Sequence, residues 1–184
     1  MKAELTEKQL FWMKTAIAAI LVLLAAVLRI LPHPWNLTPI GAMALFSGSV
    51  FKERWLRFMF PLLALLAGDA VVGFHKLMFV VYLCFVINVA IGIRLGENRK
   101  PLRIAGATLL GAVQFFLITN FAVWTVFTTY PKTVTGLIAC YVAAVPFFWN
   151  TLTGDALYAA LLFGGYALAE RFLPHTDHLP ETLR

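Results

Sequence analysis

Long apolar segments separated by short charged loops constrain this chain more than any other feature. Apolar residues make up 61% of the sequence and charged residues only 13%, whereas a soluble domain is about half apolar and a quarter charged. An α-helix of about 20 apolar residues crosses the roughly 30 Å hydrocarbon layer of a bilayer. The sequence therefore predicts an all-α polytopic membrane protein. A transmembrane β-barrel would show shorter segments of alternating hydrophobicity instead.

Prolines and charges divide the chain, residues 1–184, into six predicted spans of a single transmembrane domain. The second span is short, and we expect Pro39 in its first turn with Thr38 as its cap. Residues 133–172 are too long for one span, and Pro146 offers a place to divide them into a short interfacial helix and a last span. The predicted spans cover residues 10–31, 39–51, 56–74, 77–95, 102–127 and 151–171, and the interfacial helix covers residues 132–145.

The distribution of Lys and Arg predicts the orientation of these spans, because cytoplasmic loops carry an excess of both residues. A six-helix transmembrane bundle with cytoplasmic N- and C-termini places twelve of the 15 Lys and Arg residues inside and three (Arg29, Lys76 and Lys132) outside. A seventh crossing by residues 132–145 would change that division to ten and five. We therefore expect six spans. The net charge of +6 then reflects the loops, and no nucleic-acid partner is needed to explain it.

Polar residues of the predicted spans gather near the outer ends of the helices. Ionisable groups in a membrane are costly and indicate functional sites by default, so the pattern predicts a ligand pocket that opens outward above an apolar bundle. The candidate ligand-binding residues are Asp69, Tyr82, Asn120, Asn150 and Asp155 in or beside the spans and His33, Trp35, Asn36, His75 and Tyr130 in the outer loops, with Cys84 close by. The same residues also fit interhelical hydrogen bonds, an aromatic interfacial belt and a packed thiol.

Several enzyme classes are excluded by missing motifs. The sequence has no GxxxxGK[ST] loop for ATP, no His-Glu-x-x-His zinc helix and no Gly-x-Ser-x-Gly elbow. An enzyme acting on a lipid or quinone is disfavoured because no nucleophile–base pair is recognisable. The alternatives that stay open are a small-molecule binding protein and a structural or accessory membrane subunit with no ligand.

Three stretches resemble a group of small bacterial membrane proteins that in turn look like S components of energy-coupling-factor vitamin transporters. They are L-P-H-P-W-N-L-T-P-I-G-A-M-A-L-F-S-G, P-L-L-A-L-L-A-G-D-A-V-V-G-F-H and the stretch from Y-P-K-T-V-T-G to T-G-D-A-L-Y, and the resemblance spans residues 25–166. It implies a six-helix fold in the bacterial inner membrane, with cytoplasmic termini and a pocket for a vitamin-like small molecule that enters from the outer side. An energy-coupling ATPase module is a partner of most S components, whereas solitary members work without one.

The solitary cobalamin transporters in this neighbourhood give the best guess for the ligand. In those proteins a pocket cysteine ligates cobalt and supports decyanation of cyanocobalamin, and the matching position here is Cys84 in V-V-Y-L-C-F. Thiolate is a soft, strong ligand for such a metal. The resemblance then implies that Trp35, Tyr82 and Tyr130 pack on the corrin and that Asn36, Asp69, Asn120 and Asp155 bond its amide arms. Cobalamin would be the transported ligand, with no built-in cofactor, and another small ligand is the alternative.

Overall fold

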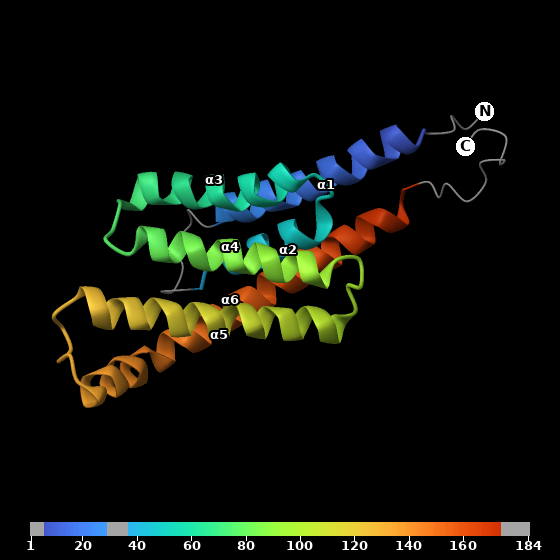
Figure 1. Cartoon of the computed structure of the whole chain (residues 1–184). Coiled ribbons are helices and arrows are strands. Elements are labelled where there is room, and N and C mark those ends of the chain that lie inside the picture. The colour runs from blue at the N-terminus through green and yellow to red at the C-terminus, as the bar shows by residue number, and fades with distance from the viewer. Residues whose placement is uncertain (1–5, 29–36, 174–184) are drawn as a thin grey trace.

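The computed structural model describes residues 6–28 and 37–173, and within these ranges the chain forms six α-helices and no β-strand (Figure 1). Each helix runs opposite in direction to the one before it, so the start of α1 and the end of α6 lie at the same end of the bundle. The helices are α1 (Glu7–Leu28), α2 (Ile40–Val50), α3 (Arg54–Val72), α4 (Met78–Leu95), α5 (Pro101–Val126) and α6 (Val134–Arg171).

Four of these helices (α1, α4, α5 and α6) are long and apolar enough to cross a membrane. The prediction of an all-α membrane protein is confirmed at this level. The first five helices begin and end within a few residues of the predicted spans. With 11 residues, α2 covers only about 16 Å at roughly 1.5 Å per residue.

The division of the last part of the chain at Pro146 is wrong. The predicted interfacial helix (132–145) and the predicted last span (151–171) form one helix, α6, which has 38 residues and contains Pro146. A proline removes one helical hydrogen bond and clashes with the preceding turn, but neighbouring helices in a membrane compensate for such breaks. The local rule for proline was therefore overridden by packing.

Contacts with α5 explain why the first turns of α6 do not form a separate helix. The Tyr141 hydroxyl donates a hydrogen bond to the Leu117 carbonyl (2.7 Å), and the Tyr141 ring lies 5.5 Å from the ring of Phe116. The Cys140 thiol lies 3.5 Å from the Asn120 carbonyl. These contacts pair the start of α6 with the end of α5 in an antiparallel hairpin, in which Thr133 caps α6 by accepting from the Gly136 N–H.

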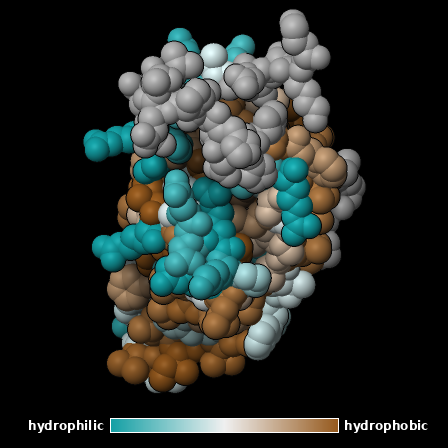
Figure 2. Space-filling model, turned by 90° about the vertical axis from the view of Figure 1, so that its right-hand side faces the viewer, coloured by the Kyte–Doolittle hydropathy of each residue, from teal (hydrophilic) through white to brown (hydrophobic). Residues whose placement is uncertain are grey.

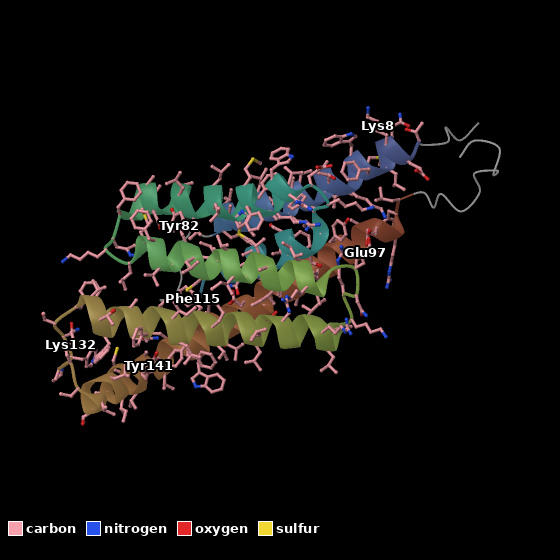
Figure 3. All side chains as sticks on the ribbon, in the orientation of Figure 1. Lys8, Tyr82, Glu97, Phe115, Lys132 and Tyr141 are labelled. Carbon is pink, nitrogen blue, oxygen red and sulfur yellow. The ribbon has the colours of Figure 1, made fainter. Side chains whose placement is uncertain are left out.

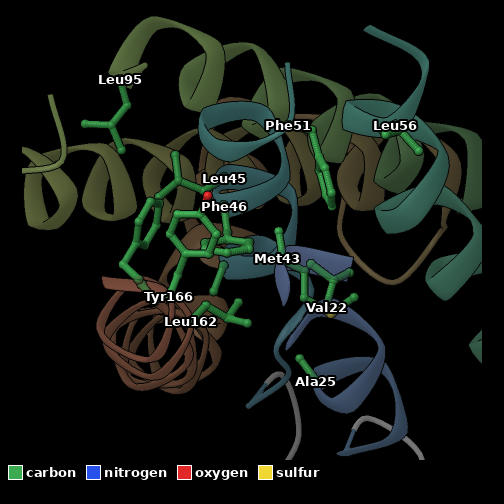
Figure 4. Packing of buried hydrophobic residues seen from close by; sticks show 14 residues of the cluster. Val22, Ala25, Met43, Leu45, Phe46, Phe51, Leu56, Leu95, Leu162 and Tyr166 are labelled. Atoms are coloured by element: carbon green, nitrogen blue, oxygen red, sulfur yellow. The ribbon is translucent and has the colours of Figure 1, made fainter. Parts of the chain in front are cut away.

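The short helix α2 is the centre of the bundle, and residues 40–49 are all buried. Glycines allow it to approach α4 closely, because a Cβ at Gly48 would lie 2.2 Å from the Val89 carbonyl oxygen and one at Gly92 would lie 2.1 Å from the Leu45 carbonyl oxygen. On its other side Phe46 packs edge-on against Tyr166 of α6, with ring centroids 5.7 Å apart (Figure 4). Glycines in α2 and α4 therefore permit close packing of these two helices.

Two guanidinium groups hold the C-terminal end of α2. The Arg99 Nε donates to the Ser49 Oγ (3.1 Å) and its Nη2 donates to the Ser49 carbonyl (2.9 Å), while the Arg57 Nε donates to the Phe51 carbonyl (2.6 Å). The last carbonyls of a helix lack intrahelical partners and carry partial negative charge. Positively charged side chains at this end therefore stabilise a helix whose residues 40–49 are all buried.

Charge is distributed unequally between the two ends of the bundle. Ten of the twelve described Lys and Arg residues belong to the end where α1 begins and α6 finishes, and only Lys76 and Lys132 belong to the other end. Figure 2 shows the first end face-on, with a hydrophilic patch at its centre. Figure 3 places Lys8 and Glu97 at that end and Lys132 and Tyr141 at the opposite one. We call these the basic end and the Lys132 end.

Candidate functional site

The buried N-terminus of α2 is the structural centre of the candidate site. It lacks a side-chain cap of its own: Pro39 is the cap residue, and the predicted capping bond from Thr38 does not form. Instead the Asp155 Oδ1 of α6 accepts a hydrogen bond from the Ala42 N–H at 3.1 Å. A Cβ at Gly41 would lie 2.3 Å from that same oxygen, so only glycine leaves room for the carboxyl group. A residue distant in sequence therefore performs the capping role.

A pocket of about 280 Å³ opens beside this capped helix end. Five helices and the α3–α4 turn contribute to it, and it extends from His75 in that turn to Asn88 and Asp155 near the middle of the bundle. Its size lies at the lower limit of small-molecule sites, which span roughly 300–1,000 Å³. The lining residues are Thr38, Gly41, Leu65, Asp69, His75, Val81, Phe85, Asn88, Phe115, Thr151 and Asp155.

The chemistry of the pocket is acidic and aromatic. Asp69 and Asp155 are both buried, with 5% and 4% of their surface exposed, and no described lining residue is Lys or Arg. The rings of Phe85 and Phe115 lie 5.5 Å apart in a tilted arrangement. Carboxyl groups attract positive charge, and aromatic faces attract organic cations. The lining therefore suits a small molecule that is cationic or rich in hydrogen-bond donors.

Three of the predicted site residues, Asp69, His75 and Asp155, lie together in this pocket. Asp69 comes from the last turns of α3, and His75 lies exposed in the turn that follows. The other lining residues were not predicted as ligand-binding candidates, and among them are the polar Asn88 and Thr151. Asn88 is 3% exposed and accepts a hydrogen bond from Gln114 (3.2 Å), and Thr151 donates to the Phe147 carbonyl (3.0 Å). An amide in the otherwise apolar 78–93 stretch was the available sequence indication for Asn88.

Other predicted residues lie elsewhere. Asn120 lines a neighbouring, more apolar cavity of about 210 Å³ and donates to the Phe116 carbonyl of its own helix (2.8 Å). Tyr82 packs against the buried cluster around Ile40 and Leu65. Tyr130 lies in the α5–α6 loop, and Asn150 is half-buried in α6. The predicted residues His33, Trp35 and Asn36 lie outside the described residues.

Cys84, the predicted cobalt ligand, is fully buried in α4 and does not line the pocket. The pocket-lining residues of α4 are Val81, Phe85 and Asn88. Adjacent residues of a helix differ by about 100° in direction, so the thiol lies to one side of the lining face. The Cys84 carbonyl accepts a hydrogen bond from Gln114 (3.1 Å), which fixes this part of α4 against α5.

Comparison with known proteins assigns this chain to a family of unknown function. No curated protein and no solved structure matches the chain. One family model matches residues 9–176, which is most of the chain, so the protein belongs to DUF6580, a family of unknown function.

Proposed function

We propose that this protein binds a small, water-soluble, cationic molecule in the pocket at the α2 N-terminus and takes it up across the bacterial inner membrane. The observation that carries the proposal is the lining itself: two buried carboxyl side chains and a pair of aromatic rings, with no described Lys or Arg among the lining residues. Buried ionisable groups in a membrane are costly. A complementary cation would offset that cost.

The proposed topology has six spans with the basic end in the cytoplasm. The ten-to-two division of the described Lys and Arg residues follows the positive-inside rule. The short α2 crosses by packing among longer helices, which a mismatched span can do at modest cost. In this orientation the pocket lies in the outer half of the bundle. That arrangement agrees with the S-component resemblance, and the lipid bilayer is the surrounding partner.

A ligand smaller than cobalamin fits the geometry better. A corrin with its side arms is far larger than a pocket of about 280 Å³, and the Cys84 thiol does not line that pocket. Cobalamin stays a prediction of the resemblance, and the geometry favours the alternative of another small ligand. The need for an ATPase module is a separate question. Uptake measured in proteoliposomes that contain the protein with or without ATP-hydrolysing partners answers it.

Two permanently charged probes of similar size test the ligand class. Benzyltrimethylammonium carries a cation and benzenesulfonate an anion on the same ring. Equilibrium dialysis with purified protein is expected to show binding of the cation only. Asp69→Asn should weaken that binding at least tenfold, whereas Glu53→Gln, which changes an exposed acid at the other end of α3, should not. Binding of the anion, or equal binding by both variants, would contradict the proposal.

A structural or accessory subunit is the second candidate function, and the bond from Asp155 to Ala42 favours it. In that case the pocket acids only hold helices together. Mass spectrometry of molecules released from protein purified out of its native membrane separates the two candidates. A stoichiometric small cation supports uptake, whereas a purified protein that carries none and binds neither probe supports the structural role.

A further inference from the structure

A narrow gap continues from the pocket into the interior of the bundle. It shares Gly41, Asn88 and Asp155 with the pocket and is too narrow to hold a water molecule. Beyond these residues it reaches Ala107 and Thr108 of α5. The gap therefore extends from the α2 N-terminus toward α5.

Thr108 also lines a groove of about 1100 Å³ between α5 and α6 on the other side of the gap. The groove runs along small residues of α6, including Ala156, Ala160 and Gly164. At its far end lie the charged and polar side chains of the α4–α5 loop and the end of α6, namely Glu97, Asn98, Arg99, Lys100 and Glu170. The groove thus leads from the gap to the basic end of the bundle.

The walls of the gap are formed mostly by small side chains. Its lining residues are Gly41, Ala42, Leu45, Asn88, Ala107, Thr108, Gly111 and Asp155, of which only Leu45 has a bulky apolar side chain. At Gly111 a Cβ would lie 2.6 Å from the Asn88 Oδ1, so glycine is needed for the close contact that shuts the gap. Small residues let helix backbones approach closely, so a small displacement of the helices is enough to change the width of the gap.

The Thr108 hydroxyl, like that of Ser47 in α2, makes no hydrogen bond within the described part of the chain. Its Oγ1 is buried and has no hydrogen-bond partner among the described residues, although the side chain is only 5% exposed. By contrast, Thr15, Thr119 and Thr151 each donate to the carbonyl four residues earlier. An unpartnered buried hydroxyl is destabilising and calls for an explanation. A passing water molecule or polar ligand would supply the missing partner.

The geometry points to a transport route through the bundle: from the pocket, past Asn88 and Asp155, through the closed gap at Thr108 and into the α5–α6 groove toward the cytoplasm. The inference rests on the proposed uptake function and deepens it, because it names the path and its constriction. The cargo is the same small cation that the pocket binds. Its positive charge would meet the side-chain oxygens of Asn88 and Asp155 on entry and of Thr108 on exit.

Cysteine accessibility tests the route without any ligand. In a background of Cys84→Ala and Cys140→Ala, Thr108→Cys and Gly106→Cys are compared in inside-out vesicles with the impermeant cation methanethiosulfonate ethyltrimethylammonium. Gly106 is two residues away on α5, and a Cβ there would meet nothing within 4 Å, so it is a matched control that faces away from the gap. We expect Thr108→Cys to react at least tenfold faster than Gly106→Cys. Equal rates would overturn the route.

Exchange across proteoliposomes tests the same route by function. Labelled benzyltrimethylammonium outside is exchanged for unlabelled probe inside, which requires no energy source. Thr108→Trp should slow this exchange at least tenfold while binding of the probe changes less than twofold, and Gly106→Trp should leave both unchanged. Exchange by Thr108→Trp at the wild-type rate would overturn the route.

Failure of the transport route and failure of the proposed binding function give different results. Binding of the probe by the wild type without any exchange refutes the route and leaves the proposed binding function standing. Absence of probe binding together with fast labelling of Thr108→Cys refutes the proposed ligand class and supports the route.

Discussion

Substitution of Gly41 by Ala should break the bond that joins α2 to α6. The added Cβ would lie 2.3 Å and 2.4 Å from the two Asp155 carboxyl oxygens, so the carboxyl group must leave the Ala42 N–H. Overpacking costs about 1–3 kcal/mol and loss of a cap about 0.5–2 kcal/mol. Against these stands a gain of up to about 1 kcal/mol from the better helix propensity of Ala. A net loss of about 2 kcal/mol in the free energy of unfolding is expected.

The assay is unfolding by dodecyl sulfate titration in mixed micelles, with Gly106→Ala as the control. A Cβ at Gly106 meets no atom within 4 Å, so that variant should be as stable as the wild type or slightly more stable. Asp155→Ala leaves the buried Ala42 N–H without its acceptor and should cost about 1–3 kcal/mol.

The double variant Gly41→Ala/Asp155→Ala supplies the decisive comparison. Because the clash disappears with the carboxyl group, it should be no less stable than Asp155→Ala alone, within about 0.5 kcal/mol. Additive losses in the double variant, or a Gly41→Ala protein as stable as wild type, would refute the reasoning.

Three further outcomes follow from contacts elsewhere in the bundle. Arg99→Ala should lower the free energy of unfolding by about 2 kcal/mol, because two hydrogen bonds to Ser49 are lost. Arg99→Lys should be destabilised as well, since an ammonium group cannot reproduce the forked geometry of a guanidinium. Dodecyl sulfate titration measures the stability of both variants. Cyanocobalamin added to purified protein should keep its absorbance spectrum with wild type and with Cys84→Ser, whereas a shift seen only with wild type would support cobalt ligation. Spin labels at Ile138 and Thr153, in a protein without native cysteines, should lie about 22 Å apart along one continuous helix. Electron paramagnetic resonance measures this distance. A much shorter distance or a broad distribution would show that Pro146 divides α6.

Apolar segment length and charged loops were sufficient to predict the first five helices, because both are local properties of the sequence. The grouping of Asp69, His75 and Asp155 was also predictable, since alternating helix directions place their ends together. The sequence did not predict that α6 is one continuous helix. Proline has a local penalty, and the contacts of Tyr141 with α5 that outweigh it join residues 24 apart.

The sequence also did not predict how each helix is rotated about its axis or which residues of different helices are in contact. The lining face of α4 includes Phe85 and Asn88 but not Cys84, and which face points inward depends on the packing of the whole bundle. The bond between Asp155 and Ala42 joins residues 113 apart in the chain. Nothing in either local sequence indicates that an acid in one helix caps another. A capping residue sought only next to the helix, such as Thr38, is therefore the wrong candidate when the helix end is buried.

The position of Asp155 connects the stability of the fold to the occupancy of the pocket. Its carboxyl group caps α2, lines the pocket and lines the gap, so one side chain contributes to the fold and to both cavities. Under the proposed function, a cation that draws this carboxyl group toward the pocket would lengthen the hydrogen bond from the Ala42 N–H and weaken the link between α2 and α6. At its opposite end α2 stays fixed by Arg99 and Arg57. Loss of the Asp155 bond would therefore leave the N-terminal end of α2 as its less firmly held end, and that end places Gly41 and Ala42 in the wall of the gap.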